Sequence, residues 1–146
     1  MKPKLISFVI SAAILMVLLP DTFAFSESIK WYSHADGIAI ARLERKKIYI
    51  NFRADWCIYC KKMEGETFKN PAVISYLNKH FISIRVDTDK EPKLAEMYGV
   101  RALPDNWFLF NNGDAIRVTK RIKGYIQTEM FLKILKSIPD DLGAKK

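Results

Sequence analysis

The sequence has few residues of the types that mark specialised protein classes. Its 146 residues include only two cysteines, two histidines, six glycines and six prolines. Two cysteines are too few for a disulfide-rich secreted scaffold, and the low glycine and proline content excludes collagen-like and proline-rich chains. No segment recurs with a period of ~20–50 residues, which excludes solenoids and propellers. A single globular domain remains, because domains commonly span ~100–150 residues.

An apolar run long enough for an ordinary membrane span is also missing. The uncharged stretch Leu5–Leu19 has 15 residues, whereas a helical span needs ~20. It follows two lysines and precedes the small residues Thr22, Ala24 and Ser26, an order typical of a secretory signal peptide. We therefore predict a signal peptide over residues 1–26, one domain over 27–138 and a flexible tail over 139–146. An uncleaved membrane anchor is the alternative for the first segment.

The chain carries an excess of positive charge, with 24 Lys and Arg against 16 Asp and Glu and a formal net charge of +8. The basic clusters lie far apart in the sequence, at Arg45–Lys47, Lys61–Lys62 and Lys120–Arg121. This scatter favours a solvated basic surface, and export also argues against nucleic acid as a partner. Attraction to an acidic partner or to anionic lipid is the functional alternative.

Hydrophobic periodicity and capping residues predict alternating helices and strands. We predict helices over 33–46, 57–65, 70–78, 91–98 and 128–137, and strands over 47–52, 81–86, 107–110 and 116–121. The segment Asn111–Asp114 between the last two strands is a hairpin signal. A βαβ unit followed by a hairpin and a final helix gives an α/β fold, with one sheet covered on both faces.

The most informative motif is Cys57-Ile-Tyr-Cys60, placed between the end of a strand and the start of a helix. At such a position the first sulfur lies over unpaired backbone N–H groups, where the helix dipole stabilises a thiolate. The second sulfur lies one turn later and can attack a mixed disulfide formed by the first. A structural disulfide or half of a zinc site are the alternatives. Zinc needs two more ligands, and neither His34 nor His80 has a motif spacing.

Three segments around this motif resemble the thioredoxin superfamily, over residues 31–138. They are residues 52–61, 86–89 and 98–104, with Gly124 before the last helix. The sequence is closer still to the C-terminal thioredoxin-like domain of the thiol-reductant transporter DsbD. The shared features are Ala-Asp-Trp-Cys-x-x-Cys-Lys, a glutamate at Glu64 and the stretch Thr67–Val73. We expect a stand-alone relative, without the transporter's membrane-spanning electron-transfer domain.

This resemblance implies a thioredoxin fold with a central mixed sheet, and it assigns roles to five residues. Cys57 would be the attacking thiolate and Cys60 the resolving thiol. Pro104 would be the family's cis-proline, whose loop faces the cysteines, and Leu103 would offer backbone groups to the substrate. Trp56 would shield the disulfide and contact the substrate. The alternatives are an ordinary loop proline at 104 and a buried aromatic at 56.

Two departures from the family pattern concern the electrostatics of the site. Asn51 lies six residues before Cys57, where thioredoxins usually carry a buried aspartate, and a neutral amide cannot accept a proton from Cys60. We expect Asn51 and Glu64 together to tune the thiol pKa values; a merely hydrogen-bonded Asn51 is the alternative. Asp105 follows Pro104 where the family commonly has threonine, which is expected to place a carboxylate near the cysteines.

These patterns predict an exported, monomeric thiol–disulfide oxidoreductase that needs no cofactor and no metal. The resemblance favours reduction of disulfides in exported proteins in the periplasm, with a DsbD-like transporter as membrane electron donor. The sequence itself does not fix the direction of electron flow. A thioredoxin-fold chaperone, or a Cu(I)-binding module using the two thiolates, is the alternative from another class.

Overall fold

The computed structural model of the chain describes residues 27–140, so the predicted signal peptide and residues 141–146 of the predicted tail lie outside it. In chain order the elements are β1 (Trp31–Tyr32), α2 (His34–Glu44), β2 (Lys47–Arg53), α3 (Ile58–Gly65), the 3₁₀ turn η1 (Thr67–Lys69), α4 (Pro71–His80), β3 (Phe81–Asp87), α5 (Pro92–Met97), β4 (Asp105–Asn111), β5 (Ile116–Lys123) and α6 (Thr128–Ser137). Within the described range, no helix combines the length and apolar character needed to cross a membrane.

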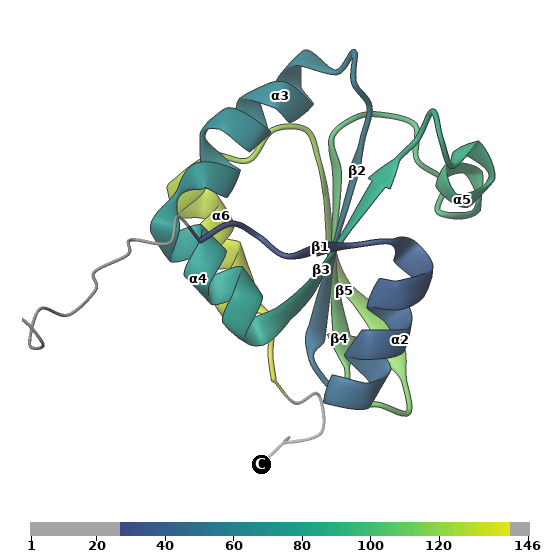
Figure 1. The fold of residues 1–146 in the computed structure, drawn as a ribbon, viewed down its shortest axis with the longest axis vertical. Helices are drawn as coiled ribbons and strands as arrows, with labels where there is room; N and C mark the ends of the chain where they lie inside the picture. Colours follow the sequence, from purple (N-terminus) through teal and green to yellow (C-terminus); the bar gives the residue numbers. More distant parts are fainter. Residues whose placement is uncertain (1–26, 141–146) are drawn as a thin grey trace, which may run out of the picture.

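The five strands form one mixed sheet in the order β1-β3-β2-β4-β5. The strands β1, β3 and β2 run parallel, whereas β4 is antiparallel to both β2 and β5. Seen edge-on, the sheet has α3, α4 and α6 on one side and α2 and α5 on the other (Figure 1). The predicted α/β class, with a central mixed sheet covered on both faces, is confirmed.

The face under α3, α4 and α6 holds an aromatic core. Tyr49 of β2 lies at its centre, with ring centroids 5.1 Å from Phe108 and 5.2 Å from Phe131. All three side chains are fully buried. Because β2 is covered on both faces, all but the last of its residues are buried, including the polar Lys47 and Asn51.

The opposite face is aliphatic and is covered by α2 and α5. Ile48, Ile50 and Ile84 form its centre. Gly37 of α2 lies directly against Ile84, and a Cβ at this position would overlap the isoleucine side chain. The glycine therefore allows the helix to approach the sheet closely, which a larger residue would prevent.

Several observed boundaries differ from the predicted ones by one or two residues, and three differences have a clear physical reason. The two-residue strand β1 was not predicted, because two residues are too few to show a period. Helix α2 ends at Glu44, since Arg45 adopts a left-handed conformation with φ of 53°. Strand β4 begins at Asp105 instead of residue 107, because the polar Asp105 and Asn106 side chains are buried and hydrogen-bonded.

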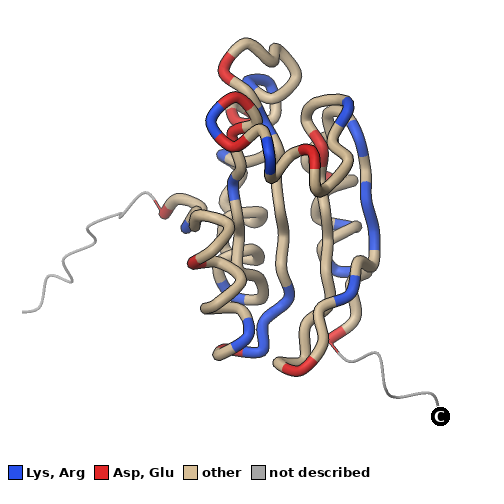
Figure 2. Tube along the Cα trace, turned by 90° about the vertical axis from the view of Figure 1, so that its right-hand side faces the viewer, with Lys and Arg blue, Asp and Glu red and all other residues tan. Residues whose placement is uncertain are grey.

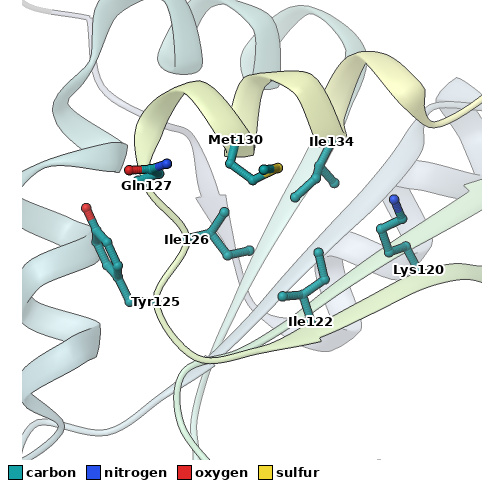
Figure 3. A pocket seen from close by; sticks show the side chains of 7 residues that line it. All are labelled: Lys120, Ile122, Tyr125, Ile126, Gln127, Met130 and Ile134. Carbon is teal, nitrogen blue, oxygen red and sulfur yellow. The ribbon is translucent and has the colours of Figure 1, made fainter.

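A groove of about 470 Å³ separates β5 from α6. Its lining residues are Lys120, Ile122, Tyr125, Ile126, Gln127, Met130 and Ile134. In Figure 3 the side chains of Ile122, Ile126, Met130 and Ile134 surround it, from β5, from α6 and from the segment between them. Lys and Arg positions are distributed over many elements and are frequent along β5, at the edge of the sheet (Figure 2).

Candidate active site

The two cysteines form a disulfide at the start of α3, with Cα atoms 5.2 Å apart. After β2 ends, the Cys57 N–H donates to the Ala54 carbonyl at 3.1 Å, which turns the chain into the helix. Cys57 is the N-cap of α3, and its Sγ accepts the Cys60 N–H at 3.1 Å. The predicted start of a helix just after Cys57 is confirmed. The first sulfur therefore accepts one of the N–H groups that the helix itself leaves unpaired.

The loop before β4 lies against the disulfide. Leu103 packs on the small buried cluster of Ala54, Cys57 and Cys60, and the Leu103–Pro104 peptide bond is cis, as the resemblance implies. The Pro104 carbonyl accepts the Gly124 N–H at 2.7 Å. The fold thus brings together the two cysteines and the Leu103–Pro104 loop, which are more than 40 residues apart in the sequence.

Apolar side chains surround the disulfide and face solvent. Trp56, Ile58 and Tyr59 are 67%, 78% and 61% exposed, whereas Cys57 and Cys60 are 5% and 2% exposed. The alternative of a buried aromatic at Trp56 is therefore wrong.

The Trp56 ring is held at the surface of the site. Its indole N–H donates to Asp89 Oδ2 at 3.0 Å. A cavity of about 220 Å³ lies beside it, next to the Leu103–Pro104 loop, and is lined by Trp56, Thr88, Ala95, Val100, Arg101, Ala102 and Leu103.

Asn51 is buried in a network of neutral polar groups. Its Nδ2 donates to Asn106 Oδ1 at 3.0 Å, and the same oxygen accepts the Tyr49 hydroxyl at 2.7 Å. Asn106 in turn donates to the Ile122 and Gly124 carbonyls. Burial raises the pKa of Tyr49 well above its ordinary value, so the hydroxyl keeps its proton. These bonds explain how an uncharged Asn51 is satisfied in the core, while its influence on the thiols stays a prediction.

Glu64 lies between two arginines that the sequence analysis did not associate with it. Its Oε1 is 3.0 Å from Arg53 Nε and 3.9 Å from Arg85 Nη1. Arg53 also pairs with Asp55 at 2.6 Å and Asp87 at 3.3 Å. Burial opposes the charge of Arg53, but the hydrogen bond to Asp55 and the neighbouring carboxylates outweigh it and raise the pKa of Arg53. The Glu64 carboxylate is thus one member of a charge network.

Asp105 is fully buried and is held by Arg121. The Arg121 Nε lies 3.0 Å from Oδ1 and 3.1 Å from Oδ2, and its guanidinium stacks over the Trp107 ring at 4.2 Å from the centroid. The carboxylate that we expected near the cysteines is therefore engaged by an arginine of β5. In the observed hairpin, Trp107 of β4 lies opposite Arg121 of β5, a register that the sequence did not predict.

The two histidines of the chain are engaged outside the disulfide. His34 Nε2 lies 2.7 Å from the Tyr98 hydroxyl, and the His80 ring packs on Tyr76. Among residues 27–140, no three His, Cys, Asp or Glu side chains gather as a metal site requires.

Known proteins share both the sequence pattern and the fold. The DsbD thiol:disulfide interchange protein of Vibrio vulnificus is 30% identical over 105 residues, which are 69% of this chain and 17% of that protein. The chain thus spans about a sixth of this relative's length. Human spermatogenesis-associated protein 20 is 30% identical over 71 residues, 48% of this chain and 9% of that protein.

Solved structures agree with this relationship. A thioredoxin from Thermus thermophilus superposes with a TM-score of 0.69 at 27% identity, covering 75% of this chain and 85% of its own. The DsbH oxidoreductase superposes with a TM-score of 0.64 at 20% identity, covering 82% and 90%, and at that identity it supports the fold alone. Residues 35–139 match the thioredoxin-like domain family. With a Cys-x-x-Cys disulfide at the start of α3 and this match over most of its length, the chain belongs to the thioredoxin-like domain family.

Proposed function

We propose that this protein is an exported thiol–disulfide oxidoreductase that reduces disulfide bonds of periplasmic proteins. The observation that carries the proposal is the Cys57–Cys60 disulfide, which caps α3 and packs against Leu103. Two thiols in this arrangement exchange two electrons with a substrate disulfide. Membership of the thioredoxin-like family and similarity to the DsbD thiol:disulfide interchange protein support the same chemistry.

The first step requires the reduced protein, in which Cys57 is a thiolate. Its sulfur attacks one sulfur of the substrate disulfide, so that a Cys57–substrate disulfide forms and the other substrate sulfur leaves as a thiolate and takes up a proton. The Cys60 N–H that reaches Cys57 Sγ at 3.1 Å stabilises the negative charge on the attacking sulfur.

The second step releases the substrate. Cys60 loses its proton and attacks Cys57 Sγ, which forms the intramolecular disulfide and expels the second substrate thiolate. The substrate has gained two electrons and two protons, and the protein holds the Cys57–Cys60 disulfide. A dithiol donor must then return two electrons by the reverse exchange. We propose a DsbD-like membrane transporter as this donor.

The surroundings of the disulfide favour polypeptide substrates over small polar disulfides. Trp56, Ile58 and Tyr59 expose apolar surface around two nearly buried sulfurs, and exposed apolar groups of this kind mark interaction sites. The Leu103–Pro104 loop lies beside them and offers backbone groups to an extended chain. Export to the periplasm is proposed from the order of basic, apolar and small residues in the first 26 positions.

The decisive experiment combines turnover with trapping. The wild-type protein should reduce insulin with dithiothreitol as electron source. Cys57→Ser should abolish this activity, and Cys60→Ser should accumulate mixed disulfides with client proteins, because the resolving thiol is absent. Equal trapping by both variants would remove the assigned roles. A folded wild-type protein that reduces no disulfide would contradict the proposal and favour the chaperone or Cu(I)-binding alternative.

Export has its own test. Cell fractionation and N-terminal sequencing of the native protein should show a periplasmic product that begins near residues 25–27. An intact Met1 on the periplasmic protein would contradict cleavage, and recovery in the membrane fraction would favour an uncleaved anchor.

A further inference from the structure

One arginine of β5 holds the loop before β4 at both of its ends. At the far end of the loop, Arg121 binds the Asp105 carboxylate, which directly follows Pro104. At the near end, Arg121 Nη2 donates to the Gly99 carbonyl at 2.9 Å. The segment 99–104 is therefore bridged by a single guanidinium, and its Leu103 packs against the cysteines.

The bridge is built to be rigid. The Asp105 carboxylate has no exposed surface, and only 27% of the Arg121 side chain is exposed. A two-pronged arginine–carboxylate contact fixes both distance and orientation. Stacking on the Trp107 ring, 4.2 Å from the guanidinium, removes further freedom from the arginine. The hydrogen bond to Asp105 raises the pKa of Arg121, so the guanidinium stays protonated.

The bridge acts on the face of the sheet away from the helix that carries the cysteines. Asp105, Trp107 and Arg121 lie on the side of α2 and α5, whereas Asn106 joins Asn51 on the side of α3. A change at Arg121 therefore alters the loop without replacing any group that contacts a sulfur. This separation makes the role of the loop measurable by itself.

We propose that the Asp105–Arg121–Gly99 bridge positions the Leu103–Pro104 loop for polypeptide substrates, which makes Asp105 and Arg121 positioning residues of the reaction. The inference rests on the proposed disulfide exchange. A polypeptide must align along the loop while its disulfide meets Cys57, so a displaced loop weakens binding of protein substrates. A small disulfide reaches Cys57 without using the loop and should be indifferent to the bridge.

The test compares Arg121→Met with Arg117→Met, which removes the same charge from an exposed position of the same strand. For Arg121→Met we expect KM for insulin to rise about tenfold, with kcat changed by less than about twofold, as loss of substrate alignment predicts. The rate of glutathione disulfide reduction and the reduction potential should stay at wild-type values. Arg117→Met should match wild type in every assay, and Arg121→Lys should recover part of the KM effect.

Because Arg121→Met leaves a buried carboxylate unpaired, it risks unfolding. The double variant Asp105→Asn/Arg121→Met removes both charges and should show the same rise in KM. Hydrogen exchange of the amides at 100–103 supplies a readout without turnover, and exchange there should accelerate in both variants but not in Arg117→Met.

Two results would overturn the inference. One is unchanged KM and unchanged exchange at 100–103 in the folded double variant. The other is a parallel loss for insulin and glutathione disulfide, which would mean that the bridge acts on the thiols themselves. If wild type reduces neither substrate, the proposed function fails, while hydrogen exchange still decides whether the bridge holds the loop.

Discussion

Removal of the Glu64 charge should make the cysteine pair more reactive. Glu64 follows Cys60 by four residues on α3, so the two side chains lie on the same helix face, with Cβ atoms ~5–6 Å apart. From this spacing we assume a distance of ~7 Å between the Glu64 carboxylate and the Cys60 sulfur. At an effective dielectric constant of ~20–40, a unit charge then raises the free energy of the thiolate by about 1–2 kcal/mol, which is about one pKa unit. Glu64→Gln should lower the apparent pKa of the cysteine pair by this amount.

The arginines around Glu64 do not cancel this expectation, because electrostatic contributions add. Arg53 and Arg85 remain in the variant, and Arg53 keeps its contacts with Asp55 and Asp87. In the variant the positive charges of both arginines remain, while one neighbouring negative charge is lost, so the thiolate is stabilised relative to wild type. The two thiols of the reduced protein titrate as a coupled pair, so the measured pKa belongs to the pair and not to one sulfur.

The assay is the rate of iodoacetamide alkylation of the reduced protein as a function of pH. A pKa lowered by one unit gives tenfold more thiolate below the midpoint, but the nucleophilicity of a thiolate falls with its pKa, with a coefficient of ~0.4–0.5. The net gain is about threefold. Glu66→Gln is the matched control. Glu66 follows Glu64 by two residues, and its carboxylate accepts a hydrogen bond from the Tyr125 hydroxyl. The same pH midpoint in Glu64→Gln and wild type would refute the reasoning.

Three further predictions concern the packing and charges around this site. Asn51→Asp should raise the apparent pKa of the cysteine pair and slow alkylation at neutral pH; an unchanged profile would show that residue 51 does not act on the thiols. Phe131→Ala should lower the free energy of unfolding by about 3–5 kcal/mol in urea titrations, because its ring is fully buried, and a loss below 1 kcal/mol would contradict the packing. The Lys47 contact lowers the pKa of Asp140 from its ordinary value of 3.8. The ion pair therefore contributes its full stabilisation above that pKa and loses it as the pH falls. Asp140→Asn should make the free energy of unfolding decrease less steeply at acid pH, and a decrease as steep as in wild type would exclude a role for the pair.

Local signals in the sequence were sufficient for most of the fold. The strands at 47–53 and 81–87 carry apolar residues at alternating positions, flanked by polar residues at their ends, and this alternation indicates β structure. Asn70 caps α4 through hydrogen bonds to the Ala72 and Val73 N–H groups, which is the arrangement that the Asn-Pro dipeptide predicts. The Cys57 cap of α3 was also predictable, because the Cys-x-x-Cys motif lies between a predicted strand and a predicted helix.

The parts that escaped prediction depend on partners far away in the chain. The Asn51–Asn106 hydrogen bond joins residues 55 positions apart, and no periodicity encodes it. Asp105 looked like a loop residue because a buried carboxylate is uncommon without a partner, and that partner, Arg121, lies on another strand. The family resemblance located the cysteines and Pro104, but it assigned no role to Arg53, Arg85 or Arg121.

The two outer strands of the sheet also determine how this protein behaves when it is crowded. Unpaired strand edges are templates for aggregation, and natural proteins protect them with short strands, bulges and lysines. On one side, β1 offers only the two residues Trp31–Tyr32. On the other, β5 has a register shift at its centre and basic residues at four of its eight positions. Two copies of the basic β5 edge repel each other, and β1 is too short for extensive pairing, so edge-to-edge association of two sheets is disfavoured.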